Sequence, residues 1–303
     1  MESTKAYILL CIASIFWGAS FILTKELFNS EPHLTVSILI TFRLLMATIA
    51  LIPTLLLLKK LEKIERQDLK WFLLLAFAEP FAYNLCETGG LQYVDGSLAA
   101  VVVATIPLFV PFGMAIAYRE KISAPTIIGV LLSFTGIYIM LSGSLSGGTD
   151  QSYKGIALLA GAVFIAVCYT LILVNIVKKY QPLTITAYQN LLGLIYYIPL
   201  TFAIDGNAIT ALSYSPKMLL LILALGVFCS TLAYAFNNYG VKKIGASSAS
   251  IFNNTIPIFT LLTALSIGQE QLTTSKAIGV LVVICGVVIA QRKRDSVQTE
   301  TDR

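Results

Sequence analysis

Three ionisable side chains lie deep inside long apolar segments, where a charge is costly to place. Arg43 falls in the segment 34–58, and Glu79 and Glu87 fall in the segment 71–92. Segments of about 20 apolar residues are long enough to cross a bilayer as helices. An ionisable group at mid-bilayer costs at least about 2.5–3.5 kcal/mol, so it almost always faces a partner or a water-filled cavity. With a rise of about 1.5 Å per residue, Arg43 lies between the two carboxylates in depth and can pair with either or both.

The two carboxylates share one face of a helix. Glu79, Tyr83, Cys86, Glu87 and Gly90 follow the i, i+4, i+7, i+8, i+11 spacing of a single helical stripe. One arginine against two carboxylates leaves one acid without a partner, and an unpaired acid at this depth is a candidate for carrying a proton. Glu79 and Glu87 are therefore candidate proton-coupling residues. The alternative is that the three charges form a structural ion pair that fixes helix packing.

The later half of the chain repeats the earlier half at an offset of 150 residues, as from Gly90 to Gly240. The matching positions include isolated glycines, a proline inside an apolar segment and an acidic residue at a segment end. They are Gly90, Pro107, Glu120, Gly129 and Gly136, which meet Gly240, Pro257, Glu270, Gly279 and Gly286. Agreement of this kind without gaps indicates an internal duplication. Because each copy is almost entirely apolar, the repeated unit is a membrane module.

The second copy carries amides where the first copy carries charges. Glu87 meets Asn237 at the same offset, and Asn238 stands beside it. Further amides in the later apolar segments are Gln189, Asn190 and Asn253. Charged groups in one half and neutral hydrogen-bonding groups in the other suit an amphipathic cargo with a polar end. Amides between helices also serve as ordinary packing contacts, each worth about 0.6–2 kcal/mol.

Ten apolar blocks of helical length must position these residues. The chain is 57% hydrophobic and 12% charged, whereas a soluble domain carries about 25% charged residues. The blocks run over 6–28, 34–58, 71–92, 97–118, 124–142, 155–177, 183–204, 217–239, 246–268 and 274–291. The sequence therefore predicts an all-α integral membrane protein with ten transmembrane helices.

The basic residues predict which ends of the helices face the cytoplasm. With the N-terminus inside, sixteen of the 21 Lys and Arg residues fall in inward segments, four fall in outward segments, and Arg43 lies within a helix. The inward set is Lys5, Lys59, Lys60, Lys63, Arg66, Lys70, Arg119, Lys121, Lys178, Lys179, Lys242, Lys243, Arg292, Lys293, Arg294 and Arg303. The outward set is Lys25, Lys154, Lys217 and Lys276. Lys and Arg accumulate on the cytoplasmic side of membrane proteins, so both termini are predicted to be cytoplasmic. The net charge of +5 is then an orientation signal, and nucleic acid is not an expected partner.

Five spans in each copy is an odd number, so the second copy must enter the membrane from the opposite side. The copies are then inverted repeats, related by a pseudo-two-fold axis in the membrane plane. The predicted domains are repeat 1 over 6–142, a polar linker over 143–154, repeat 2 over 155–291 and a basic, polar tail over 292–303. Inverted halves that exchange conformations give inward- and outward-open states, which is the physical basis of alternating access.

Prolines and small residues predict kinks and close contacts. Pro107 and Pro257 are repeat mates, and each denies a hydrogen bond to the carbonyl four residues earlier. Both helices are therefore expected to kink beside a central cavity. Two glycine pairs, Gly129 with Gly136 and Gly279 with Gly286, should allow close helix packing. Glu270 is expected to hold the start of the following helix at Thr273 and Thr274.

Short motifs accompany the duplication. They are FWG at residues 16–18, TIPLF at 105–109 and TIPIF at 255–259. With two five-span repeats, the chain resembles the EamA type of the drug/metabolite transporter superfamily over residues 6–291. The resemblance implies a ten-helix inverted-repeat carrier in the bacterial inner membrane that moves small metabolites, often amino acids and frequently outward. It also implies a substrate cavity lined by Trp17, Arg43, Glu79, Tyr83, Asn84, Glu87, Tyr169, Gln189, Asn190, Asn237, Asn238 and Asn253.

Export of an amino acid or related zwitterion is the leading hypothesis, with Arg43 holding the carboxylate and Glu79 or Glu87 holding the ammonium. The alternative cargo is an organic or quaternary cation, held by Trp17 and tyrosine faces beside a carboxylate.

A membrane-embedded enzyme and a passive channel are the other classes of function. No histidine lies within an apolar block, and no G-x-x-x-x-G-K-[ST] motif occurs, so we expect no enzyme activity, cofactor or metal. Energy would then come from a gradient, with protons a candidate coupling ion. The expected location is the plasma membrane, with monomer and homodimer both open.

Overall fold

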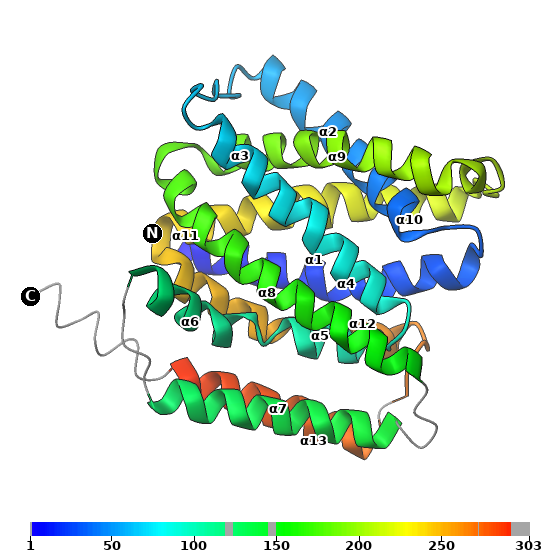
Figure 1. The fold of residues 1–303 in the computed structure, drawn as a ribbon, viewed down its shortest axis with the longest axis vertical. Helices are drawn as coiled ribbons and strands as arrows, with labels where there is room; N and C mark the ends of the chain where they lie inside the picture. The colour runs from blue at the N-terminus through cyan, green and yellow to red at the C-terminus, as the bar shows by residue number, and fades with distance from the viewer. Residues whose placement is uncertain (1, 119–123, 145–149, 272, 292–303) are drawn as a thin grey trace, which may run out of the picture.

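The computed structural model describes residues 2–118, 124–144, 150–271 and 273–291, and all regular structure within them is helical. Most of the helices run roughly along one direction and form a single bundle (Figure 1). Glu120, the centre of the predicted linker at 145–149 and the predicted tail at 292–303 lie outside the described residues.

The helices occupy all the predicted apolar blocks. In the first half they are α1 (Glu2–Ser30), α2 (Val36–Leu57), α3 (Leu69–Ala76), the π-helix η1 (Phe77–Ala82), α4 (Tyr83–Leu91), α5 (Gly96–Val103), α6 (Ile106–Tyr118) and α7 (Ala124–Ser144). In the second half they are α8 (Asp150–Lys179), α9 (Pro182–Thr210), α10 (Pro216–Ala224), the π-helix η2 (Leu225–Leu232), α11 (Ala233–Ser250), the 3₁₀ helix η3 (Ile251–Thr255), α12 (Ile256–Ser266) and α13 (Thr274–Gln291). The prediction of an all-helical fold is confirmed.

Six helical segments of the described chain are long and apolar enough to cross a membrane. They are Ser3–Ser30, Val36–Leu57, Gly96–Ala117, Tyr153–Lys179, Pro182–Thr210 and Pro216–Ala246. Shorter apolar helices run over Ile127–Ile139 and Thr274–Gly286. That all ten predicted blocks cross the membrane stays a prediction.

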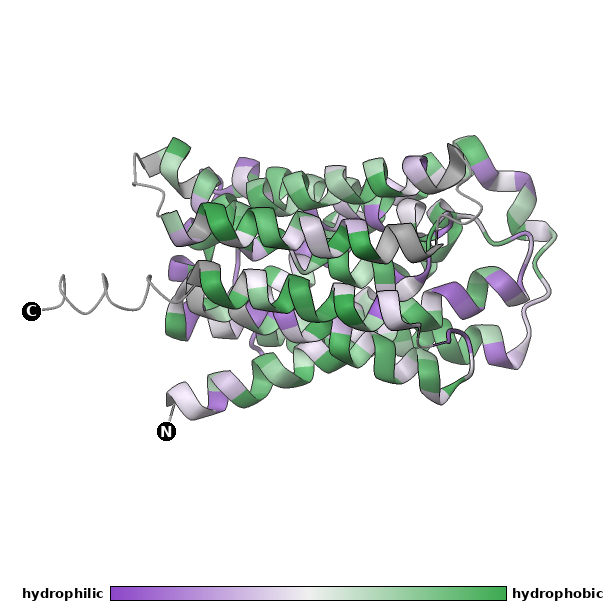
Figure 2. Cartoon of the chain, turned by 90° about the horizontal axis from the view of Figure 1, so that it is seen from below, coloured by the Kyte–Doolittle hydropathy of each residue, from purple (hydrophilic) through white to green (hydrophobic). Residues whose placement is uncertain are grey.

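The outside of the bundle is apolar. Leu57 and Ile116 are 84% and 86% exposed, and Phe164 and Phe202 are 71% and 68% exposed. Hydrophobic residues dominate the helices, whereas several of the hydrophilic stretches lie at the ends of the bundle (Figure 2). Large apolar side chains exposed over a whole lateral surface would be unfavourable in water, so this surface suits contact with lipid.

α7 and α13 lie side by side along one edge of the bundle (Figure 1). A Cβ atom added to Gly136 would lie 2.7 Å from the carbonyl oxygen of Gly279, and one added to Gly286 would lie 2.7 Å from that of Gly129. The prediction that these glycines allow close packing is confirmed. As the residue number falls along one helix it rises along the other, so the helices are antiparallel. Gly286 is the repeat mate of Gly136, and Gly129 is the repeat mate of Gly279. The two contacts are therefore equivalent when the repeats are exchanged, as a local two-fold axis requires.

Helix breaks also recur at equivalent positions of the two halves. η1 and η2 are π-helical segments that match at the repeat offset. The helix is interrupted between Val103 and Ile106 in the first half and passes through η3 in the second, in both cases just before a proline, Pro107 or Pro257. The predicted kinks are confirmed. Proline lacks the amide donor that would continue a helix from the preceding turn.

Glu270 joins the two halves at the end of the bundle opposite the start of α1. Its carboxylate accepts hydrogen bonds from the backbone amide of Ser97 (3.0 Å) and from the Ser97 hydroxyl, and it forms an ion pair with Lys276 (2.9 Å). Lys276 also pairs with Asp95 at 2.9 Å. Glu270 therefore joins the start of α5 to the first turn of α13. It holds the start of the following helix as predicted, but through Lys276 rather than through Thr273 or Thr274, and its contact with Ser97 was not predicted. Thr273 also accepts a hydrogen bond from the amide of Lys276 at the start of α13.

Candidate functional site

A central cavity of about 110 Å³ lies between the two halves of the chain. Its wall combines α1, α2, η1, α4, α5 and α6 with α8, α11, η3 and α12. The predicted residues that line it are Trp17, Arg43, Glu79, Tyr83, Asn84, Glu87, Tyr169, Asn237 and Asn253. A cavity beside the kinks was predicted, and the structure confirms it. That these residues bind a substrate stays a prediction.

Trp17 reaches the cavity because α1 and α12 pack closely. A Cβ atom added to Gly18 would lie 2.7 Å from the Cβ of Phe259 and 3.0 Å from the carbonyl oxygen of Ile256. The FWG and TIPIF motifs therefore touch each other. The indole ring of Trp17 meets the ring of Tyr234 edge-on, with centroids 5.2 Å apart. Edge-to-face contact is a favourable arrangement of aromatic rings, so it fixes both side chains at the wall.

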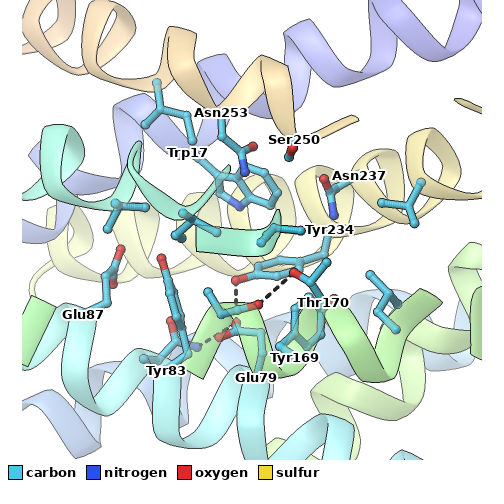
Figure 3. A pocket seen from close by; sticks show the side chains of 18 of the residues that line it. Trp17, Glu79, Tyr83, Glu87, Tyr169, Thr170, Tyr234, Asn237, Ser250 and Asn253 are labelled. Carbon is cyan, nitrogen blue, oxygen red and sulfur yellow. Dashed lines mark hydrogen bonds between the residues drawn. The ribbon is translucent and has the colours of Figure 1, made fainter. Parts of the chain in front are cut away.

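Glu79 lies at a break in the helix. Its backbone is extended (φ −140°, ψ 119°) within η1, and the peptide bond to Pro80 is cis. The carboxylate oxygen Oε1 accepts hydrogen bonds from the hydroxyl of Tyr234 (2.5 Å) and the amide of Asn84 (3.2 Å). Oε2 is buried and has no hydrogen-bond partner among the described residues. Glu79 is 3% exposed, so a carboxylate is held against the cavity with one oxygen unbonded (Figure 3).

Arg43 is also buried, but its partner is a hydroxyl. Its Nη2 donates to Oγ of Ser230 at 3.3 Å, and its Nε has no partner among the described residues. The close packing of η2 on α2 places Ser230 there, since a Cβ added to Gly226 would lie 2.7 Å from the carbonyl oxygen of Arg43. Within the described chain Arg43 forms no ion pair with Glu79 or Glu87. The predicted pairing was wrong, because the extended backbone at Glu79 turns that carboxylate toward Tyr234 and Asn84.

Glu87 is a second carboxylate on the wall, in α4, eight residues after Glu79. It is half-buried, and its Oε2 accepts a hydrogen bond from the hydroxyl of Thr88 at 3.0 Å. Asn237 and Asn253 lie across the cavity from the two carboxylates (Figure 3). Charged groups from the first half and amides from the second thus face one cavity.

Three predicted residues do not line the cavity. Gln189 and Asn190 lie in a small neighbouring pocket behind Glu79, and Gln189 donates to the backbone carbonyl of Glu79 at 3.1 Å. Asn238 is fully buried and donates to the hydroxyl of Thr186 at 3.1 Å. The face of α9 that carries these partners packs against η1 and α11, so the three amides support the wall from behind.

Tyr234 is the main residue that sequence reasoning missed. It lies at the repeat position of Asn84, and both side chains donate to the same oxygen of Glu79. Ser230 in η2 and Tyr234 in α11 are four residues apart, the same helical spacing as Glu79 and Tyr83, and Asn237 continues the stripe. This shared spacing is the signal in the sequence that could have identified Tyr234.

These features define the class of the protein. It is a multi-pass helical membrane protein with an apolar exterior and a polar-lined cavity between its halves. Among the described residues no group of three or more His, Cys, Asp or Glu is placed to hold a metal ion. Comparison with known families is more specific: residues 4–142 and again 153–291 match the EamA-like transporter family. The chain belongs to this family of membrane transporters and contains two of its repeats.

Related proteins carry transporter names. The chain is 28% identical to an "Uncharacterized transporter" of Archaeoglobus fulgidus, covering 96% of this chain and 100% of the relative. It is 26% identical to the "Uncharacterized transporter YetK" of Bacillus subtilis, covering 95% and 87%. It is 23% identical to the "WAT1-related protein At2g37450" of Arabidopsis thaliana, covering 95% and 87%. A solved crystal structure shares the fold with a TM-score of 0.68 at 15% identity, covering 93% of this chain and 96% of that one.

Proposed function

We propose that this chain is a secondary transporter with ten spans and cytoplasmic termini, which moves a small polar metabolite across the plasma membrane by alternating access. The antiparallel contact of α7 with α13 and the matching helix breaks support inverted repeats. α1 begins and α13 ends at the same end of the bundle, where α8 also ends at Lys179 (Figure 1). The lysines at that end support a cytoplasmic orientation.

The proposed cargo is an amino acid or related zwitterion, moved outward. One observation carries this proposal: Arg43, Glu79 and Glu87 line the same cavity without forming ion pairs with one another. The guanidinium is free to hold a carboxylate, and a carboxylate of the wall is free to hold an ammonium. Buried charges are costly without partners, so a cargo that carries both charges would compensate both sides of the cavity at once.

Coupling to protons is the second part of the proposal. The unbonded oxygen of Glu79 can take either a proton or the cargo's ammonium group, but not both. Because the proton and the ammonium group compete for the same carboxylate, binding of one releases the other. This competition is a simple means of exchanging them across the membrane. Glu87, half-buried on the same wall, is the other candidate for this role.

An organic cation is the second candidate cargo. The edge-on pair of Trp17 and Tyr234 lies beside Glu79, and Tyr83 and Tyr169 complete an aromatic wall. Aromatic faces attract quaternary ammonium groups by about 0.5–2 kcal/mol each, and a nearby carboxylate adds to that attraction.

Exchange in proteoliposomes tests the proposal. Purified protein is reconstituted into vesicles loaded with unlabelled amino acids, and the entry of a labelled amino acid is followed beside protein-free vesicles. We expect saturable exchange that excess amino acids compete and choline does not. Competition by choline alone would favour the cation, and non-saturable entry would favour a channel. Entry no faster than in protein-free vesicles for both classes of compound would contradict the proposal.

A further inference from the structure

A second cavity, which we call the lysine pocket, lies at the end of the bundle where α1 begins and α2 ends. It has a volume of about 540 Å³ and lies between α1, α9, α11 and the segment after α2. Lys5, Lys59 and Lys60 line it, and Leu9 and Phe236 form part of its apolar wall. It shares no lining residue with the central cavity. The transport site therefore does not account for it.

The lysines stand directly after an exposed apolar turn. Leu56, Leu57 and Leu58 are 58%, 84% and 57% exposed at the end of α2. Lys59 then adopts a left-handed conformation (φ 54°), and Lys60 donates its amide to the carbonyl of Leu55 at 2.9 Å. This is a helix stop that glycine usually makes. The switch from exposed leucines to lysines within one turn marks the boundary between hydrocarbon and headgroups.

The pocket carries an excess of positive charge. Within the described chain Lys5, Lys59 and Lys60 form no ion pair. The ammonium of Lys5 lies 5.6 Å from the ring centroid of Tyr239, which also lines the pocket. Glu62 is the acidic residue of the lining, and its Oε2 already accepts the backbone amide of Gln181 at 2.6 Å. Three lysines thus line one concave space whose single acidic residue is already engaged.

We propose that the lysine pocket binds an anionic phospholipid of the phosphatidylglycerol class. The three ammonium groups would hold the headgroup phosphate, and the acyl chains would lie along Leu9, Phe236 and the exposed leucines of α2. Basic pockets between helices at a membrane surface are suited to anionic headgroups, and their apolar floor favours a lipid over a soluble phosphate. Because the pocket lies apart from the central cavity, a failure of lipid binding leaves the transport proposal intact, and the reverse also holds.

Native mass spectrometry of the delipidated, detergent-solubilised protein tests this site. The protein is titrated with phosphatidylglycerol, with phosphatidylcholine of the same chains, and with glycerol 3-phosphate. We expect one tight phosphatidylglycerol site and weaker binding of the other two compounds. The triple variant Lys5→Gln, Lys59→Gln, Lys60→Gln should lose affinity by about fivefold for each lysine. The matching triple change to Arg should retain binding, which separates loss of charge from misfolding.

A matched control removes the same charge from the same end of the molecule. Lys63, Arg66 and Lys178 are exposed and do not line the pocket. Their triple change to Gln should leave phosphatidylglycerol affinity within about twofold, because exposed charges outside a site contribute little. An equal loss in the control, or equal binding of phosphatidylcholine, would overturn the proposal. Tight, lysine-dependent binding of glycerol 3-phosphate would assign the pocket to a soluble phosphate and would overturn its assignment to a phospholipid.

Discussion

At the scale of single residues, Glu79 is the most unusual group of the cavity. One of its oxygens receives two hydrogen bonds, from Tyr234 and Asn84, and the other receives none among the described residues. A buried polar atom without a partner costs about 1–3 kcal/mol. A bound cation or a proton would complete the bonding of this oxygen. Binding of a cation or a proton at Glu79 would therefore supply the hydrogen bond that this oxygen lacks.

Replacement of Glu79 by Gln should weaken exchange and remove its dependence on pH. The amide keeps the volume and can still accept from Tyr234, but it can neither hold an ammonium group nor take up a proton. Loss of one charged hydrogen bond of about 1.5 kcal/mol or more corresponds to at least a tenfold loss of exchange rate. The measurement is labelled amino acid exchange in proteoliposomes across neutral pH.

Glu65→Gln is the control for that variant. Glu65 is exposed outside the spanning segments, and the hydrogen bond from Lys179 lowers its pKa, so it stays charged across neutral pH. Its loss should change neither rate nor pH profile. An unaltered rate and profile in Glu79→Gln would remove Glu79 from the mechanism.

The sequence was sufficient to find these charges but not their partners. Depth in an apolar segment identifies Arg43, Glu79 and Glu87 as cavity residues, because a charge there must face a cavity or a partner. Which group meets which depends on the extended backbone at Glu79 and the approach of η2 to α2. The extended backbone at Glu79 has a local signal, because Pro80 disfavours a helical conformation at the residue before it. The approach of η2 to α2 has none, and neither feature names the facing group, so the partners Tyr234 and Ser230 were not predicted.

At the scale of elements, the breaks in the helices mark the site. η1 supplies Glu79, and the interruption before Ile106 and the segment η3 both reach the cavity wall. π-helical turns are rare and occur frequently at functional sites. Sequence predicted the proline kinks, since proline removes a backbone donor, whereas nothing in the sequence distinguishes a π-helical turn from an α-helical one around Phe228 in η2.

Gly136→Ala and Gly286→Ala should destabilise the protein to a similar extent. In each case the new Cβ would lie 2.7 Å from a carbonyl oxygen of the facing helix, so α7 and α13 must separate. Overpacking of this kind costs about 1–3 kcal/mol. The measurement is the thermal unfolding temperature in detergent, compared with the parent protein.

Gly206→Ala is the matched control within α9. A Cβ there meets nothing within 4 Å, and alanine is more favourable than glycine in a helix by about 0.5–1 kcal/mol. Its unfolding temperature should be equal to or above that of the parent. If Gly136→Ala unfolds no earlier than this control, the close α7–α13 contact is not present in the protein.

At the scale of the whole molecule, the two ends of the bundle use their lysines differently. The lysines that were predicted to face outward all have partners. Lys217 pairs with Glu26, Lys276 with Glu270, Lys154 with the hydroxyl of Tyr93, and Lys25 with two carbonyl oxygens of the segment before α5. At the other end Lys59 and Lys60 have no ion-pair partner within the described chain. The lysines predicted to face outward therefore join helices together. The lysines predicted to face inward are mixed, because Lys179 forms ion pairs with Glu65 and Asp68, whereas Lys59 and Lys60 form none within the described chain.

The contacts of Glu270 join helices at the end of the bundle that is predicted to face outward, and we infer that they help to close it. Glu270 and Lys276 have side chains that are 7% and 10% exposed, and they join α13 to the start of α5 through Ser97. The central cavity, by contrast, is lined by Leu173, which lies in the half of α8 that ends at Lys179, and by Val241, which precedes Lys242 and Lys243 within α11. Alternating access requires the outward contact to open when the inward end closes, so its strength should set the population of the outward-open state.

Glu270→Gln should therefore raise the outward-open population. Loss of a charged hydrogen bond worth about 1.5 kcal/mol or more in the closed state would shift the equilibrium at least tenfold. In a protein without its native cysteines, Ser20→Cys on the cavity wall reports opening through its labelling rate with an impermeant thiol reagent added outside. Lys217→Gln, which removes an ion pair whose lysine is 61% exposed, should leave that rate nearly unchanged. Equal labelling in Glu270→Gln and the parent would show that this contact does not hold the outward end closed, and that closure depends on helix packing alone.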